Sequence, residues 1–403
     1  MQIEQADVYV VKVDQHYRVG GHDSAPNRLP GTDYYFEPQW RQAYSRLTET
    51  CLVKLTTSTG LSGWGEAQAP LSPETPASIL VRLIGPAVIG QPALSSEWIY
   101  ERLYHMMLVR GQNGGFLLDA IGAVDTALWD IRGLTWNAPI CELLGGRFQT
   151  RLPAYLSGLR KPTPNERIEA AKQACLAGMR GVKVFSGQPT ADSLEELRAV
   201  RDAIGSEALL AVDCIHSSDW AGAMKIGSLL DELNGAFFEA PLGSEDVEGH
   251  RSLGSRIRTR IAGGEYLRSV QQFLPWLQSG AIRIAQPDVV RSGVTAVRRI
   301  ANIAHAMHIP VALHVGVCSG IGMAATWQVA ASLPNFMIQE HQFDLFETAN
   351  RFLETKLETD RGQLVVPEGP GLGVRVCEDE VLRHAVEHWT VTADGPKLNS
   401  RSS

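Results

Sequence analysis

Seven ionisable residues recur along this chain at an almost constant interval, and each stands at the end of a short apolar run. The steps between successive members are 30, 26, 26, 23, 26 and 26 residues. The seven are Lys183, Asp213, Glu239, Glu265, Asp288, His314 and Glu340. A short apolar run is typical of a buried parallel strand. The rhythm therefore predicts a (β/α) barrel, in which the charged strand ends meet at the C-terminal mouth, where active sites of this fold lie.

The segments on either side of this rhythm have other patterns. Residues 6–13 and 51–57 alternate between apolar and polar side chains, as antiparallel strands do, and residues 76–144 are mainly helical in pattern. A long Gly- and Pro-rich loop is expected between the first two strands, at about 16–44. The barrel strands are expected at 153–158, 181–185, 208–213, 236–240, 259–265, 282–286, 310–314 and 336–340.

Composition excludes several classes of protein. The net charge of −7 argues against a nucleic-acid partner, and no apolar stretch is long enough to cross a membrane. The first residues lack the layout of a signal peptide. Six scattered cysteines without a Cys-x-x-Cys pair indicate reduced thiols. These features predict a cytoplasmic globular protein.

Three of the seven strand ends carry carboxylates in succession: Asp213, Glu239 and Glu265. Three such groups at one barrel mouth repel one another unless a cation lies between them. Oxygen ligands favour Mg²⁺, or Mn²⁺ as a substitute, over zinc. Each acid alone could instead cap a helix or pair with an arginine, but all three in register favour a metal site.

The next two strand ends, Asp288 and His314, predict a general base, because a carboxylate fixes the tautomer of a neighbouring imidazole and raises its basicity. A histidine alone on an apolar strand would more often be structural. Lys183 is expected across the mouth, where it could neutralise charge on a substrate oxygen; the alternative is an ordinary lysine that reaches solvent. Together with a metal, these groups could remove a proton next to a carboxylate and hold the resulting enediolate.

The motifs in their order resemble the enolase superfamily, and within it the mandelate racemase and muconate lactonizing enzyme-like branch, which is rich in acid-sugar dehydratases. The resemblance rests on Gly63-Trp-Gly-Glu66-Ala, the helix Ala123-Val-Asp-Thr-Ala-Leu-Trp-Asp-Ile-Arg-Gly, Leu143-Leu-Gly-Gly, Glu239-Ala-Pro, Gly264-Glu265, Gln286-Pro-Asp288 and Pro370-Gly-Leu-Gly. It implies magnesium on Asp213, Glu239 and Glu265, a His314–Asp288 dyad, and Glu340 as the acid beside the substrate carboxylate.

The resemblance also implies the domain organisation. We expect an α/β fold: a modified TIM barrel, (β/α)7β, at 146–354 beneath an α+β capping domain. The capping domain is expected at 1–145, completed by 355–390. The polar tail at 391–403 is expected to be disordered.

Three departures from the branch bear on mechanism. Racemases of this branch carry Lys-x-Lys on the second barrel strand, whereas Phe185 takes the place of the second lysine here. Ile215 takes the place of a common asparagine. His216 after it could be a second acid, but it is expected to face solvent. Ala240 replaces a frequent second glutamate. Arg291, three residues after Asp288, is expected to orient that acid rather than to contact substrate.

Specificity is expected in the capping loops, where polar groups could bind several hydroxyls and a distal charge. The candidates are His22, Arg28, Tyr34, Tyr35 and Gln68, although each could be an ordinary surface residue. We therefore predict an Mg²⁺-dependent hydro-lyase that dehydrates an aldonic or aldaric sugar acid to a 2-keto-3-deoxy acid. The alternatives are a one-base epimerase or cycloisomerase and a sugar-acid-binding pseudoenzyme. A small-molecule sugar acid is the expected partner, and a homo-oligomer the expected assembly.

Overall fold

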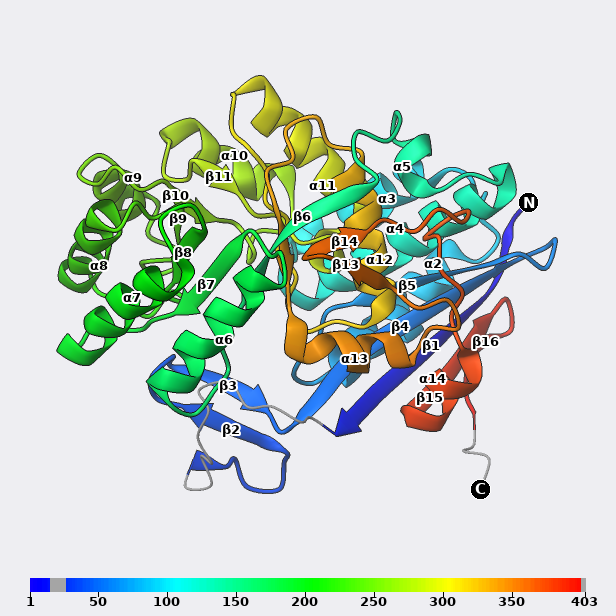
Figure 1. The fold of residues 1–403 in the computed structure, drawn as a ribbon. Helices are drawn as coiled ribbons and strands as arrows, with labels where there is room; N and C mark the ends of the chain where they lie inside the picture. Colours follow the sequence, from blue (N-terminus) through cyan, green and yellow to red (C-terminus); the bar gives the residue numbers. More distant parts are fainter. Residues whose placement is uncertain (15–26, 400–403) are drawn as a thin grey trace.

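A computed structural model describes residues 1–14 and 27–399. It contains a parallel barrel and, beside it, an antiparallel sheet with its own helices (Figure 1). This is the α/β fold that the sequence predicts, a modified TIM barrel with an α+β capping domain. None of the helices in the described part has the length and apolar character needed to span a bilayer.

The capping sheet has the strand order β16-β15-β1-β4-β5. Its central strand is β1 (Ile3–Asp14), which pairs antiparallel with β4 (Leu47–Thr57) on one side and β15 (Ala385–Thr392) on the other. The edge strands are β5 (Ser62–Ala67) and β16 (Gly395–Leu398). The first and last strands of the described chain therefore lie in one sheet (Figure 1).

Helices between β5 and the barrel cover this sheet. They are α1 (Glu74–Ile79), a π-helical turn (Leu80–Ile84), α2 (Gly85–Val88), α3 (Ser96–Met106), a 3-10 turn (Leu108–Arg110), α4 (Gly115–Trp136) and α5 (Ile140–Leu143). The residues of α4 from 117 to 131 are buried on every side of the helix. It lies between β5 and the barrel helix α11, so both of its faces are covered.

Small residues permit that close packing. A Cβ atom on Gly65 would lie 1.9 Å from the Ala123 carbonyl oxygen of α4, and one on Gly122 would lie 2.8 Å from the Gly293 nitrogen of α11. The glycines therefore let two backbones approach where no side chain fits.

The barrel strands match the predicted positions closely. They are β6 (Arg151–Ser157), β7 (Gly181–Phe185), β8 (Leu209–Asp213), β9 (Phe237–Glu239), β10 (Ile261–Gly263), β11 (Ile284–Ala285) and β12 (Gln339–His341). Neighbouring strands from β6 to β11 pair in parallel, and β12 pairs with β6. The eighth position is held by residues 311–314, which form bridges through Val311 to Ala285 and Phe336 and through His314 to Asp288, so the ring closes.

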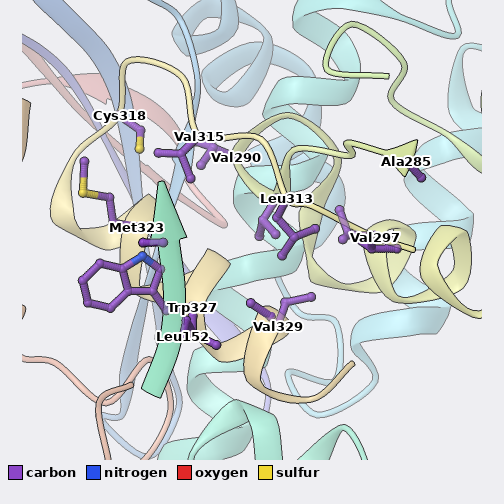
Figure 2. Close-up of a cluster of buried hydrophobic side chains, with 14 of the residues drawn as sticks. Leu152, Ala285, Val290, Val297, Leu313, Val315, Cys318, Met323, Trp327 and Val329 are labelled. Carbon is purple, nitrogen blue, oxygen red and sulfur yellow. The ribbon is translucent and has the colours of Figure 1, made fainter. Parts of the chain in front are cut away.

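The barrel helices are α6 (Pro164–Leu176), α7 (Ala191–Ile204), α8 (Trp220–Glu232), α9 (Val247–Gly254), α10 (Val270–Ser279), α11 (Val289–Ala306), α12 (Gly320–Ala331) and α13 (Phe343–Arg351). Asp219 caps α8, because its side chain accepts the Gly222 N–H at 2.7 Å. The core between strands and helices includes Leu152, Leu313, Val297 and Trp327 (Figure 2).

Three expectations need correction. The tail at 391–403 is not disordered over 391–399, because β15 and β16 form a hairpin that pairs with β1. The supposed loop at 16–44 contains a hairpin of β2 (Tyr34–Glu37) and β3 (Gln42–Ser45). Of the segment 355–390, α14 (Glu378–His384) and β15 contact β1, whereas β13 (Glu358–Asp360) and β14 (Gln363–Val365) extend the barrel sheet from β6.

Candidate active site

The seven ionisable residues meet at one end of the barrel, as the sequence predicts. Asp213 and Glu239 are the last residues of β8 and β9 and are direct neighbours in the sheet. Asp288 and His314 are neighbours through a bridge. Lys183, Glu265 and Glu340 complete the group, and ion pairs connect all seven.

Lys183 lies buried among three carboxylates. Its Nζ is 2.9 Å from both Glu239 Oε2 and Glu340 Oε1 and 3.3 Å from Asp213 Oδ2. Burial alone would lower its pKa, but the charges of Glu239 and Glu340 hold the pKa well above the usual value. Lys183 is therefore a fixed cation, not a lysine that reaches solvent.

His314 and Asp288 form the expected dyad. The Nδ1 atom of His314 is 2.7 Å from Asp288 Oδ2, and the other oxygen of Asp288 accepts the Val290 N–H at 2.7 Å. This bond leaves Nε2 of His314 for the cavity, where it lies 2.7 Å from Glu265 Oε2. Burial lowers the pKa of His314, but Glu265, Glu340 and Asp288 together raise it well above the usual value.

The three proposed metal ligands do not form a closed metal cage. In residues 1–14 and 27–399, no group of three His, Cys, Asp or Glu side chains has the spacing of a metal site. Instead Asp213 and Glu239 pair with Lys183, and Glu265 pairs with His314.

The donor set nevertheless fits a hard divalent cation. Glu239 Oε1 is buried without a hydrogen-bond partner in the described part of the chain. Burial raises the pKa of Glu239 to about 8 and that of Asp213 to about 6; Lys183 opposes both shifts, and neighbouring carboxylates add to them. These carboxylates repel one another, and the Glu239 Oε1 atom has no hydrogen bond to a described residue. A bound divalent cation would stabilise such a group.

A cavity of about 330 Å³ opens over these groups, between the barrel mouth and the cap. From the barrel it is lined by Lys183, Phe185, Asp213, His216, Glu265, Arg291, His314 and Glu340, among others. From the cap it is lined by β3 and the segment after β5, including Tyr44, Gln68 and Pro70. The cavity is thus lined by acids, cations and a few rings, which suits a small polar anion.

The predicted substrate-binding residues have different positions. Gln68 lines the cavity, whereas Arg28 and Tyr34 do not. Arg28 is exposed and donates to the Thr32 carbonyl at 2.8 Å, and the Tyr34 hydroxyl donates to Glu49 at 3.0 Å and accepts the Ser72 N–H. Tyr35 is buried but does not line the cavity. His22 lies outside the described residues.

Two residues that the sequence placed elsewhere line the cavity. His216 does not face solvent: its Nδ1 contacts the Leu242 carbonyl at 2.8 Å, and its Nε2 is 3.8 Å from Glu265. Ile215 and His216 both have left-handed backbone angles, with φ of 48° and 57°, so the chain turns sharply at this point. The side chain of Arg291 does not orient Asp288, but donates to Gln68 Oε1.

Arg160 also lines the cavity, and the sequence analysis missed it. It follows β6 and donates to Gln342 Oε1 at 2.8 Å. Its position two residues beyond the end of the predicted barrel strand 153–158 was the available signal, because residues that follow such strands line the mouth.

Comparison with known families identifies the architecture. Residues 166–380 match the enolase C-terminal domain-like family, and residues 41–145 match the N-terminal domain of the mandelate racemase / muconate lactonizing enzyme family. The chain belongs to the enolase superfamily, in its mandelate racemase-like branch. It is accordingly an enzyme of this superfamily.

Individual relatives are similar over most of their length. Arabinonate dehydratase of Saccharolobus solfataricus is 28% identical over 81% of this chain and 88% of the relative. D-galactarolactone cycloisomerase of Agrobacterium fabrum is 29% identical over 81% and 89%. A solved enolase superfamily member from Agrobacterium tumefaciens superposes with a TM-score of 0.90 at 30% identity and covers 99% of both chains. This enolase superfamily member therefore keeps the complete two-part architecture of its relatives.

Proposed function

We propose that this enzyme is an Mg²⁺-dependent dehydratase of an aldonic or aldaric sugar acid. The observation that carries the proposal is the arrangement of a fixed cation, Lys183, and an Asp-oriented imidazole, His314, around one cavity with three metal-type carboxylates. Sites of this superfamily use a lysine or histidine base with magnesium. Bound to Asp213, Glu239 and Glu265, magnesium (or Mn²⁺) would supply a Lewis acid for the substrate carboxylate.

The base is His314. The hydrogen bond from Nδ1 to Asp288 fixes the tautomer, so Nε2 is the atom that takes the proton from C2 of the acid. In this structure Nε2 contacts Glu265, so His314 can act once Glu265 has another partner. Glu340 lies between Lys183 and His314, 2.9 Å from Lys183 Nζ and 4.0 Å from His314 Nε2. The Lys183 ammonium stabilises the negative charge that develops on the substrate carboxylate.

The elimination can use the same imidazole. After the C2–H bond breaks, the proton is on Nε2 and the electron pair is in the enediolate. The C3–O bond then breaks as the enediolate collapses, and the leaving hydroxyl takes the proton from His314 to form water. The resulting enol tautomerises to a 2-keto-3-deoxy acid. A single histidine in both steps makes this a syn elimination.

A cycloisomerase is the second candidate, because D-galactarolactone cycloisomerase is among the similar proteins at 29% identity. It would share the proton removal but would not expel water. Incubation of the enzyme and Mg²⁺ with a library of aldonic and aldaric acids, followed by mass spectrometry, tests the choice. A product lighter by one water supports the dehydratase, whereas a product of unchanged mass supports the cycloisomerase. No turnover and no α-proton exchange on any acid would support a sugar-acid-binding pseudoenzyme.

The remaining expectations stay predictions. A cytoplasmic location is consistent with six cysteines that are all unpaired in the structure. Association into a homo-oligomer can be measured by light scattering. The roles of His22, Arg28 and Tyr34 in substrate binding can be tested by substitution, although the structure does not bring Arg28 or Tyr34 to the cavity.

A further inference from the structure

The cations that line the cavity differ in how they are neutralised. Lys183 has three carboxylates within 3.3 Å, and His314 lies 2.7 Å from both Asp288 and Glu265. Arg160 is 3.6 Å from Asp344. For Arg291, by contrast, no carboxylate oxygen lies within 4.0 Å in residues 1–14 and 27–399. Arg291 is thus a cation at the cavity wall without an ion-pair partner in the described residues; its charge acts only at longer range on Glu265 and Asp119.

Gln68 holds the Arg291 guanidinium in place. The Nε atom of Arg291 donates to Gln68 Oε1, while the Gln68 backbone N–H and side-chain Nε2 donate to the carbonyls of Val290 at 3.3 Å and Val317 at 3.4 Å. A Cβ atom at Gly316 would lie 2.1 Å from Gln68 Nε2, so a glycine is needed for this approach. With Nε engaged, the two terminal nitrogens of Arg291 make no hydrogen bond to a described residue.

The position of Arg291 separates it from the Lys183 end of the cavity. Lys183 is on β7 and Arg291 follows β11, and these strands are four places apart in a ring of eight. The two cations therefore lie on opposite sides of the barrel mouth. Because Arg291 bonds to Gln68 of the cap, it lies at the rim that faces the cap.

We propose that Arg291, held by Gln68, binds a second carboxylate at the far end of the substrate, so that the substrate class is a dicarboxylic sugar acid (an aldarate). This inference rests on the proposed function, because it takes the reacting carboxylate to lie at the Lys183 end. A guanidinium with two free terminal nitrogens matches a carboxylate in a bidentate pair, and such pairs are stronger than bonds to a neutral hydroxyl. An aldonate has only a CH2OH group at that end, which leaves the cation unpaired.

A pair of achiral ligands tests the inference without knowledge of the sugar. Adipate and 6-hydroxyhexanoate both have six carbons and differ only in the second carboxylate. With the parent enzyme and Mg²⁺, calorimetry should show adipate binding about 10- to 100-fold more tightly. Arg291→Gln should reduce this preference to nearly onefold while it leaves the affinity for 6-hydroxyhexanoate within a few fold.

Gln68→Glu is the sharper variant. It keeps Arg291 but gives the guanidinium an acid of its own, which then competes with the ligand carboxylate. The preference for adipate should fall as far as in Arg291→Gln. Arg198→Gln is the matched control, because Arg198 is an exposed arginine on α7 that pairs with Glu232 away from the cavity. Circular dichroism identifies any variant that fails to fold. Gln68→Glu and Arg291→Gln change the same contact in different ways, so a loss of the adipate preference in both supports the role of Arg291.

The outcomes separate the two proposals. Equal affinity of the parent for the two ligands, or a preference that survives both substitutions, would overturn the role of Arg291. If the preference for adipate depends on Arg291 but no acid is dehydrated, the dicarboxylate site stands and the dehydratase proposal fails. If both hold, aldarates should exceed the matched aldonates in kcat/KM, and Arg291→Gln should remove that advantage.

Discussion

The ammonium of Lys183 lies 6.0 Å from the centre of the Phe185 ring, two residues along the same strand. Residues two apart on a strand point to the same side, so both side chains face the cavity. Lys183 is kept charged by its carboxylates, and Phe185 has no group that can move a proton. The β7 side of the cavity therefore lacks a free base.

Because the β7 side lacks a free base, the α-proton should be removed from only one face of the substrate. With His314 as the base, the enzyme should exchange the α-proton of one enantiomer of a 2-hydroxy acid in deuterium oxide and should not racemise it. Proton NMR of each pure enantiomer checks this. Exchange of both enantiomers at similar rates would require a second base, and His216 would be the next residue to test because it lines the same cavity.

Replacement of His314, the proposed base, should strongly slow both dehydration and α-proton exchange. His314→Asn is expected to lower dehydration and α-proton exchange by at least about 10²–10⁴-fold, the range that a general base contributes. Asp288→Asn should lower both as well, because the tautomer of His314 is no longer fixed. If His314→Asn exchanged the proton at nearly the parent rate, another group would have to be the base.

The three metal-type acids give a test of the cofactor. Asp213→Asn, Glu239→Gln and Glu265→Gln should each abolish turnover while circular dichroism shows a folded barrel. Each should also weaken Mn²⁺ binding, measured by the decrease in the free Mn²⁺ signal in electron paramagnetic resonance. Full activity in the presence of excess chelator would contradict the magnesium assignment.

Lys183 also has a structural role that can be separated from catalysis. Lys183→Met leaves Asp213, Glu239 and Glu340 buried without their shared cation. In chelator, the free energy of unfolding should fall by about 3–5 kcal/mol, the usual cost of breaking a buried ion pair. Urea denaturation measures it, with Lys225→Met on the exposed side of α8 as the control. A loss below about 1 kcal/mol would mean that the acids become neutral by taking up protons instead.

The sequence predicted the repeating barrel strands, but it missed elements whose structure depends on residues far away in the chain. The barrel strands were predictable because seven of the eight are short apolar runs that end in a charge. The strand β15 was missed because its residues are mostly half-buried, so backbone pairing with β1 determines it. The hairpin β2–β3 was missed because it follows a stretch of the segment 16–44 that is rich in glycine, proline and polar residues, and the whole segment was interpreted as a loop.

The same reason explains the errors at the site. Seven site residues were predicted from their positions at strand ends, because the strands of a parallel barrel all end at the same mouth. They are Lys183, Asp213, Glu239, Glu265, Asp288, His314 and Glu340. The role of Arg291 depends on Gln68, which is 223 residues away in the chain. The inward position of His216 depends on left-handed backbone angles that its residue type does not predict.

The close contact between β5 and α4 in the capping domain predicts that one added methyl group has a large effect on stability. A Cβ atom at Gly65 would lie 1.9 Å from a backbone oxygen of α4, which cannot move like a side chain. Gly65→Ala should therefore destabilise the protein by about 3 kcal/mol or more. Gly243→Ala is the control, because nothing lies within 4 Å of a Cβ atom there. Equal urea midpoints for the two variants would show that α4 and β5 can separate without cost.

A buried histidine away from the metal-type acids predicts a pH effect on stability. His250 packs edge-on against Trp276, and its Nδ1 is 2.7 Å from the Asp246 carbonyl oxygen, so the neutral ring donates there. Burial lowers the pKa of His250 to about 4 from the usual value of 6.5. Between these values the unfolded chain binds a proton that the folded protein does not, so stability should rise with pH from 4 to 6.5 and then level off.

The size of that effect can be isolated by substitution. The His250 contribution between pH 4 and 6.5 should be on the order of 2–3 kcal/mol. His250→Asn keeps an N–H donor near the Asp246 carbonyl but does not titrate, so urea denaturation at pH 5 and pH 7 should show a smaller difference than in the parent. His105→Asn, at an exposed position on α3, is the control for the loss of a histidine. An unchanged difference in His250→Asn would mean that the folded protein accepts the proton on His250 at pH 5 without loss of stability.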